Sequence, residues 1–196
     1  MTTVWAVYFS GTGTTERTVT HIAGELARLL AAPCRSLDFT RPQVRQQELN
    51  FCQSDLVVLG TPVYAGRVPN VLLKYLTGKL RGSGALAIPV VLFGNRNFDD
   101  GLIELRNILE QDGLRAVAGA AFSRTLAAGR PDKQDLARAE DFARAAAEKI
   151  AALSALPETA VAVRGEEPLR PYYTPRDRQG KAVNILKVKP LTDLDK

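Results

Sequence analysis

The stretch from Val4 to Thr15, VWAVYFSGTGTT, decides the fold. Its first half, Val4 to Phe9, is rich in β-branched and aromatic residues, which predicts a strand. The strand ends at a turn that holds two glycines and four hydroxyls, and an apolar repeat with the period of a helix follows it. That repeat consists of Val19, Ile22, Ala23, Leu26 and Leu30. We therefore expect a strand, a tight turn and a helix in direct succession.

The same alternation of strand and helix continues to about residue 153. Further strands are predicted at residues 35–39, 55–60, 87–93 and 114–122, and further helices at 68–76, 102–109 and 132–153. Pro89 cannot donate to a ladder, so regular pairing of its strand is expected to begin at or just after it. Gly113 is expected to end the third helix, and Asp132 to cap the last one. Five strands separated by helices predict a parallel sheet with helices on both faces.

The composition of the 196-residue chain excludes several classes of protein. Hydrophobic residues make up 45% and charged residues 24%, as in a globular protein with a packed core. Apolar runs are far shorter than the ~20 residues that span a bilayer, and the N-terminus lacks a signal-peptide pattern, so we expect no membrane span and a cytoplasmic location. The net charge of +5 is spread without a basic run, so no nucleic-acid partner is expected. Cys34 and Cys52 have no partners at metal-ligand spacing, which predicts mostly buried free thiols and no metal site.

The loop between the first strand and helix has the features of an anion site, because glycines let several N–H groups converge at a helix N-terminus. A Walker loop is rejected, since no lysine follows Gly13. A dinucleotide fingerprint would need a third glycine in place of Glu16, although Asp38 could bind a ribose. A site for a terminal phosphomonoester, as in FMN, and a plain turn with hydroxyl caps both stay open. The loop consists of Ser10, Gly11, Thr12, Gly13, Thr14 and Thr15.

Two further loops belong to the same edge of the predicted sheet, where ligands bind outside the carboxyl ends of parallel strands. They offer an aromatic ring, glycines and amide groups, which suit a planar, partly apolar ring with polar edges. The first loop contains Thr61, Pro62, Val63, Tyr64, Ala65 and Gly66, and the second Gly94, Asn95, Arg96, Asn97, Phe98 and Asp99. No Ser–His–Asp, Cys–His or paired-carboxylate set accompanies them, so no catalytic residue is predicted. His21 is expected at an ordinary helix position.

These three loops, in this order, resemble the flavodoxin family over residues 3 to 153. The resemblance implies a flavodoxin-like, doubly wound five-stranded parallel sheet of order 2-1-3-4-5 that binds FMN without a covalent bond. Residues 10–15 would then hold the FMN phosphate. Tyr64 would stack on one face of the isoalloxazine, and Phe98 is the candidate for the other face. The resemblance further implies that Ala65 or Gly66 presents a backbone carbonyl to N5 of the half-reduced flavin, and that Asn95 binds the polar edge of the ring.

A narrower resemblance reaches the C-terminal part of the chain. Residues 94–100, 128–132 and 187–190 resemble the flavodoxin half of flavodoxin–ferredoxin fusion proteins (EFR type), in which a four-cysteine iron–sulfur module follows. We therefore expect an FMN-binding domain at residues 1–155 and an extended, proline-rich tail or linker at 156–196. In a fusion protein this tail would lead to a ferredoxin-like module, whose cysteines this sequence does not contain.

The expected function is electron transfer through FMN to or from an iron–sulfur or other redox partner, fused or separate. The first alternative is an NAD(P)H-dependent quinone or flavin-type oxidoreductase with a second substrate site over the flavin. The second alternative is a partner-binding scaffold without redox chemistry. Arg67, Arg96 and Arg130 depart from the acidic surroundings usual in the family. They predict a less negative reduction potential, because positive charge stabilises the anionic reduced flavin.

Overall fold

The computed structural model describes residues 3–94, 96–123 and 131–183, and its centre is a parallel sheet. The strand order is β2-β1-β4-β6, and both β7 and β8 pair with the far side of β6. This is the predicted order 2-1-3-4-5, so the doubly wound α/β prediction is confirmed. The strands of this sheet are β1 (Val4–Tyr8), β2 (Cys34–Asp38), β4 (Leu56–Pro62), β6 (Leu86–Phe93), β7 (Arg115–Ala116) and β8 (Ala120–Ser123).

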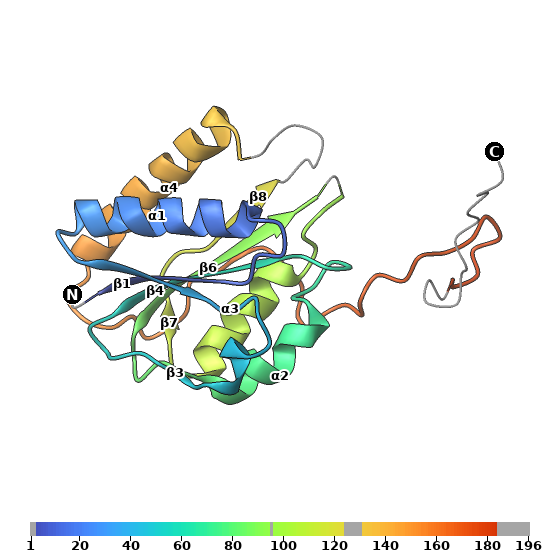
Figure 1. Cartoon of the computed structure of the whole chain (residues 1–196), viewed down its shortest axis with the longest axis horizontal. Helices are drawn as coiled ribbons and strands as arrows, with labels where there is room; N and C mark the ends of the chain where they lie inside the picture. Colours follow the sequence, from blue (N-terminus) through green and yellow to red (C-terminus); the bar gives the residue numbers. More distant parts are fainter. Residues whose placement is uncertain (1–2, 95, 124–130, 184–196) are drawn as a thin grey trace.

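Within the described residues, α-helices cover both faces of the sheet (Figure 1). α1 (Thr14–Leu29) and α4 (Lys133–Ala151) lie on one face, and α2 (Asn70–Lys79) and α3 (Gly101–Gln111) on the other. Each pair encloses its own cluster of buried aliphatic side chains, because the apolar residues of each helix recur on one side. Two predicted helix-end signals are confirmed: Gly113 follows α3 with a φ of 82°, and Asp132 caps α4 through a capping box with Asp135. The helix expected at 68–76 instead spans residues 70–79.

The fifth predicted strand is interrupted, and Pro89 explains the interruption. Pairing of β6 begins at Leu86, so the expectation that it starts at or after Pro89 is wrong. Pro89 lies inside β6 opposite Leu59 of β4, while β7 pairs only with residues 86–87 and β8 only with residues 90–93. The gap in pairing thus falls beside the residue that has no N–H to donate.

Other details differ from the sequence-based expectations or extend them. Cys34 and Cys52 are exposed rather than buried, since β2 is an edge strand and Cys52 lies in a loop. His21 occupies an ordinary helix position and contacts Glu140 of α4 at 3.0 Å. The sequence did not predict a short parallel pair of β3 (Leu49–Asn50) with β5 (Leu80–Arg81), or the 3-10 turn η1 (Val44–Gln46) before it. In the described part of the chain, no helix is long and apolar enough to cross a membrane.

The chain beyond α4 returns along the domain as an extended segment, residues 161–173, which we call the strap. It begins where the N–H of Val161 donates to the carbonyl of Ala116 at 2.9 Å. Val163 then packs against the core on the α2–α3 side. The strap ends beside the loop after β4, and the last described residues lie away from the sheet and helices (Figure 1). The strap therefore connects the domain to the C-terminal arm, residues 174–183.

Candidate functional site

The loop between β1 and α1 has an open backbone cradle. Gly13 is the N-cap of α1 with a φ of 78°. Apart from the adjoining residues, no atom of the described residues lies within 4 Å of the place where a Cβ on Gly11 or Gly13 would stand. The hydroxyl of Ser10 accepts from the N–H of Glu16 at 3.1 Å, which fixes the loop against the first turn of the helix. Ser10 thus caps the N–H of Glu16, while Gly13 offers no side chain to cap α1, and the other N–H groups of the first turn lie at the positive end of the helix dipole, where anions bind. The backbone N–H groups and the hydroxyl side chains of this loop are donors of the kind that bind a phosphate group.

A cavity of about 260 Å³ lies between three loops at the carboxyl ends of β1, β4 and β6. Tyr64 stands at its rim with 47% of the residue exposed, so its ring is accessible to a planar ligand. Except for Leu92, all lining residues belong to the set predicted from the sequence. The lining consists of Gly11, Thr12, Thr15, Pro62, Val63, Tyr64, Leu92 and Gly94. We call this cavity the crevice.

The loop after β4 forms a tight turn from Tyr64 to Arg67. The N–H groups of these two residues donate to each other's carbonyls, at 3.0 and 3.1 Å. Ala65 and Gly66 between them both have positive φ, 51° and 82°. A Cβ on Gly66 would stand 2.4 Å from the carboxylate of Asp99, so the turn requires glycine there. This turn places Tyr64 at the crevice.

Both carbonyls of this turn are already hydrogen-bonded. The carbonyl of Ala65 accepts from the N–H of Tyr173 in the strap at 2.8 Å, and that of Gly66 accepts from the N–H of Asp100 at 3.0 Å. The resemblance assigned one of these carbonyls to N5 of a half-reduced flavin. That role remains a prediction, and it would place the flavin in competition with a hydrogen bond of the protein.

Several predicted site residues do not line the crevice. Phe98 packs against Phe93 with ring centroids 5.2 Å apart and contacts the core on the α2–α3 side, which favours a packing role over a second stacking face. Thr61 is fully buried at the end of β4 and its hydroxyl has no partner among the described residues. Asn95 lies outside the described residues.

The arginines predicted to raise the reduction potential are offset by carboxylates. The guanidinium of Arg67 forms two hydrogen bonds with buried Glu104, at 2.8 and 2.6 Å, and this pairing raises the pKa of Arg67. Arg96 pairs with Asp99 at 2.8 Å. Arg130 lies outside the described residues. Because a neighbouring carboxylate offsets each of these two charges, Arg67 and Arg96 no longer give a reason to expect a less negative reduction potential of the flavin.

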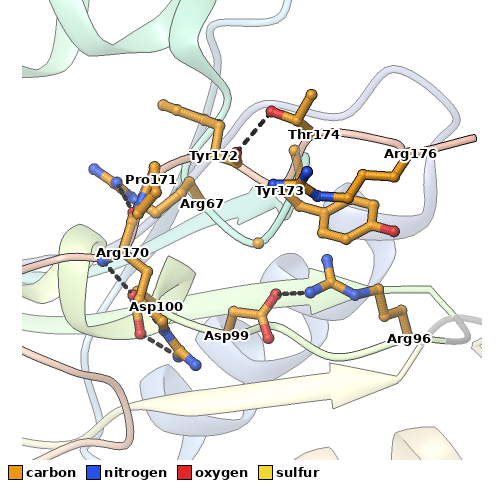
Figure 2. Close-up of a pocket in the computed structure, with 12 residues that line it drawn as sticks. Arg67, Arg96, Asp99, Asp100, Arg170, Pro171, Tyr172, Tyr173, Thr174 and Arg176 are labelled. Carbon is orange, nitrogen blue, oxygen red and sulfur yellow. Dashed lines mark hydrogen bonds and ion pairs between the residues drawn. The ribbon is translucent and has the colours of Figure 1, made fainter. Parts of the chain in front are cut away.

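A second cavity of about 370 Å³ lies between the strap and the turn (Figure 2). Arg96 is stacked over the ring of Tyr173 at 4.0 Å, and the guanidinium of Arg170 binds the carboxylate of Asp100. Sequence reasoning missed Asp100, Arg170 and Tyr172 as parts of this region. The aromatic pair at 172–173 in a proline-rich tail was the available signal, but it does not reveal which surface the tail covers.

The crevice and the sheet define a flavodoxin-like α/β protein. Residues 6–94 match a family model described as flavodoxin domain, a span that includes the cradle and the loop after β4. An archaeal flavodoxin superposes with a TM-score of 0.57 and 14% identity, covering 77% of this chain and 99% of that one. An NADH:FMN oxidoreductase in its apo form gives a TM-score of 0.57 and 15% identity, covering 79% and 92%.

The flavodoxin-like fold is also present within a larger protein. Rubredoxin oxygen:oxidoreductase from Desulfovibrio gigas gives a TM-score of 0.53 and 15% identity, over 76% of this chain and 37% of that one. The comparison with curated proteins found no match. The family model matches less than half of the chain, and at these identities the structural likeness shows the fold.

Proposed function

We propose that this chain binds FMN without a covalent bond in the crevice and transfers electrons through it. The observation that carries the proposal is that the cradle residues Gly11, Thr12 and Thr15 and the exposed ring of Tyr64 line one cavity. A phosphate needs converging N–H and hydroxyl donors, and a flavin ring needs an accessible aromatic face. Both are provided at the same edge of the sheet.

In this proposal each group of residues has a binding role. The loop from Ser10 to Thr15 and the N-terminus of α1 hold the phosphate, and Tyr64 contacts the isoalloxazine. Gly94 and Pro62 form the walls of the crevice and exclude water from part of the ring. FMN, when bound, exchanges one or two electrons, and the chain orients it and sets its surroundings.

We further propose an iron-containing redox partner, either an iron–sulfur protein or a fused module. The support is indirect: the fold matches 37% of the rubredoxin oxygen:oxidoreductase and 36% of a Synechocystis flavodiiron core. In both of these proteins a flavodoxin-like part lies within a longer chain. A fused ferredoxin-like module would fit the resemblance of residues 187–190, which lie outside the described residues.

The second candidate is an FMN-dependent oxidoreductase that uses a nicotinamide cofactor. Its support is the likeness to the NADH:FMN oxidoreductase together with the 370 Å³ cavity beside the turn. Such an enzyme needs a second binding site within reach of the flavin, and this cavity shares the turn from Tyr64 to Arg67 with the crevice. Anaerobic mixing of the FMN-loaded chain with NADH or NADPH decides between the two. Rapid bleaching of the flavin supports the enzyme, whereas reduction only by a reduced iron–sulfur protein supports the carrier.

The binding site is tested by comparing FMN with riboflavin, which lacks the phosphate. We expect FMN to bind more tightly than riboflavin. Thr12→Val should weaken the binding of FMN and leave the binding of riboflavin unchanged. Thr20→Val is the matched control, because Thr20 lies on α1 and does not line the crevice, and its hydroxyl donates to the carbonyl of Glu16 at 2.7 Å. Equal affinities for the two flavins would contradict the phosphate cradle. A chain that binds neither flavin would point to the scaffold alternative.

A further inference from the structure

The strap contacts the turn at the crevice through several groups. Besides the hydrogen bond from the N–H of Tyr173 to Ala65, the guanidinium of Arg67 donates to the carbonyl of Arg170 at 2.5 Å. The same guanidinium lies 4.9 Å from the ring centre of Tyr172. The hydroxyl of Tyr172 donates to the carbonyl of Val68 at 2.7 Å, just after the turn. The contacts therefore concentrate on the segment that carries Tyr64.

Asp100 forms hydrogen bonds with both the strap and the turn. Its N–H donates to the carbonyl of Gly66 at 3.0 Å, which holds the turn. Its carboxylate is fully buried and accepts from the N–H of Glu166 at 3.0 Å and from the N–H of Arg170 at 2.8 Å. It also binds the guanidinium of Arg170, at 2.9 and 2.5 Å (Figure 2). Displacing the strap would remove these donors from the carboxylate of Asp100, directly beside the turn.

We propose that the docked strap positions the turn from Tyr64 to Arg67, so that the affinity of the crevice for FMN depends on strap docking. The inference rests on the proposed function and adds a means of regulating the same site. Asp100 and Arg170 are then positioning residues, since neither lines the crevice. An event that displaces the strap, including one that acts on the C-terminal arm, would lower the affinity for FMN.

Coupling of this kind is reciprocal, which gives the proposal two independent measurements. If docking of the strap favours FMN binding, then FMN binding must favour docking by the same factor. Couplings between sites commonly correspond to about 5- to 150-fold in affinity. FMN should accordingly slow the amide exchange of residues 164–173, which are distant in sequence from the crevice, in the wild-type chain.

The main experiment compares Arg170→Ala with Glu167→Gln in the full chain. Arg170→Ala removes the guanidinium from Asp100. Glu167→Gln removes the charge of a strap carboxylate that pairs with Arg106 of α3 at 3.4 Å and accepts from Asn107 at 2.5 Å, and neither contact touches the turn. We expect Arg170→Ala to weaken FMN binding at least about 5-fold. The control should stay within about 2-fold of wild type, although both variants lose some stability in urea.

A backbone test separates the hydrogen bond at Ala65 from the side chains. Tyr173→Pro removes the N–H that donates to this carbonyl, whereas Tyr173→Ala removes the ring and keeps the N–H. We expect the proline variant to bind FMN more weakly than the alanine variant. Equal affinities of these two variants would show that this hydrogen bond does not transmit strap docking.

The outcomes separate this proposal from the proposed function. If Arg170→Ala loses stability but keeps its affinity for FMN, the strap is only structural and the inference is overturned. If the wild-type chain binds no FMN, the proposed function fails, and amide exchange in the apo protein decides the inference. Faster exchange at Tyr64 and Arg67 in the variant supports positioning of the turn, and unchanged exchange contradicts it. Should Arg170→Ala not fold, Arg170→Lys keeps the charge but loses the paired geometry and takes its place.

Discussion

Replacing Asp100 by asparagine tests how much the buried carboxylate contributes to the folded state. Hydrogen bonds from the Arg170 guanidinium, followed by backbone N–H donors, lower the pKa of Asp100 from 3.8 to about 2 against the opposing effect of burial. Because the folded pKa lies below the unfolded one, the ionised carboxylate stabilises the fold. A difference of about 1.8 pKa units corresponds to about 2.4 kcal/mol at pH 7. We expect Asp100→Asn to lower the free energy of unfolding by about this amount.

The pH dependence of this loss is the sharper part of the test. The stabilisation is fully present well above the unfolded pKa of 3.8 and is lost as the pH falls through the folded pKa of about 2. At pH 3 it should have fallen to about 1.3 kcal/mol. Urea unfolding of both chains at pH 7 and pH 3 measures the difference. Asp141→Asn is the control: this exposed carboxylate pairs with Arg144, and its loss should cost less than about 0.5 kcal/mol. A loss for Asp100→Asn below about 1 kcal/mol at pH 7, or one that does not shrink at pH 3, would refute the reasoning.

Three further substitutions test other parts of the structure. Burial raises the pKa of Asp112 to about 6, so its charged form opposes folding at neutral pH. Asp112→Asn should therefore raise the free energy of unfolding at pH 7 by up to about 3 kcal/mol. Urea unfolding measures this gain, which should be small at about pH 4. Glu104→Gln leaves Arg67 without its buried charged partner and should lower the free energy of unfolding in urea by about 3 kcal/mol. A loss below about 1 kcal/mol would contradict the importance of this pair. Gly60→Ala would place a Cβ 2.2 Å from a methyl group of Val19. Thermal unfolding should therefore show a loss of stability of about 1–3 kcal/mol. An unchanged melting temperature would contradict the close packing of α1 on β4.

The main architecture was predictable because its signals are local. Buried parallel strands are apolar on both faces, as in Leu56–Pro62, and the helices repeat their apolar residues every three to four positions. Strand order followed from the family resemblance, and the sheet confirms it. The interruption beside Pro89 was not predicted, because it depends on how two strands pair across the sheet.

The candidate site was predicted in part. Gly11, Thr12 and Thr15 of the predicted loop come together with Tyr64 at the crevice, as their places at strand ends suggested. Phe98, by contrast, packs against Phe93, because an aromatic residue in a loop can satisfy its burial in the nearby core as well as at a ligand. The partners of Arg67 and Asp100 lie 37 and 70 residues away in sequence, and no local pattern indicates such pairs.

Pairs of residues that are far apart in sequence also fix the position of the strap. Its sequence has no helical or strand period, so its path is fixed by a few polar contacts, chiefly those of Asp100 and Arg67. The groups that receive the strap lie on the turn after β4 and at the start of α3, which are brought together only in the folded domain. The sequence indicated an extended tail, and the structure adds that residues 161–173 lie against the domain beside the crevice.

The central claim is that the crevice holds FMN, and a visible absorption spectrum tests it most directly. The purified chain is mixed with FMN, freed of unbound flavin by desalting, and its spectrum is compared with that of Tyr64→Ala treated in the same way. The account predicts flavin bands near ~450 nm that survive desalting in the wild-type chain and are reduced in the variant. A wild-type chain that retains no flavin, or a variant that retains as much as the wild type, would contradict it.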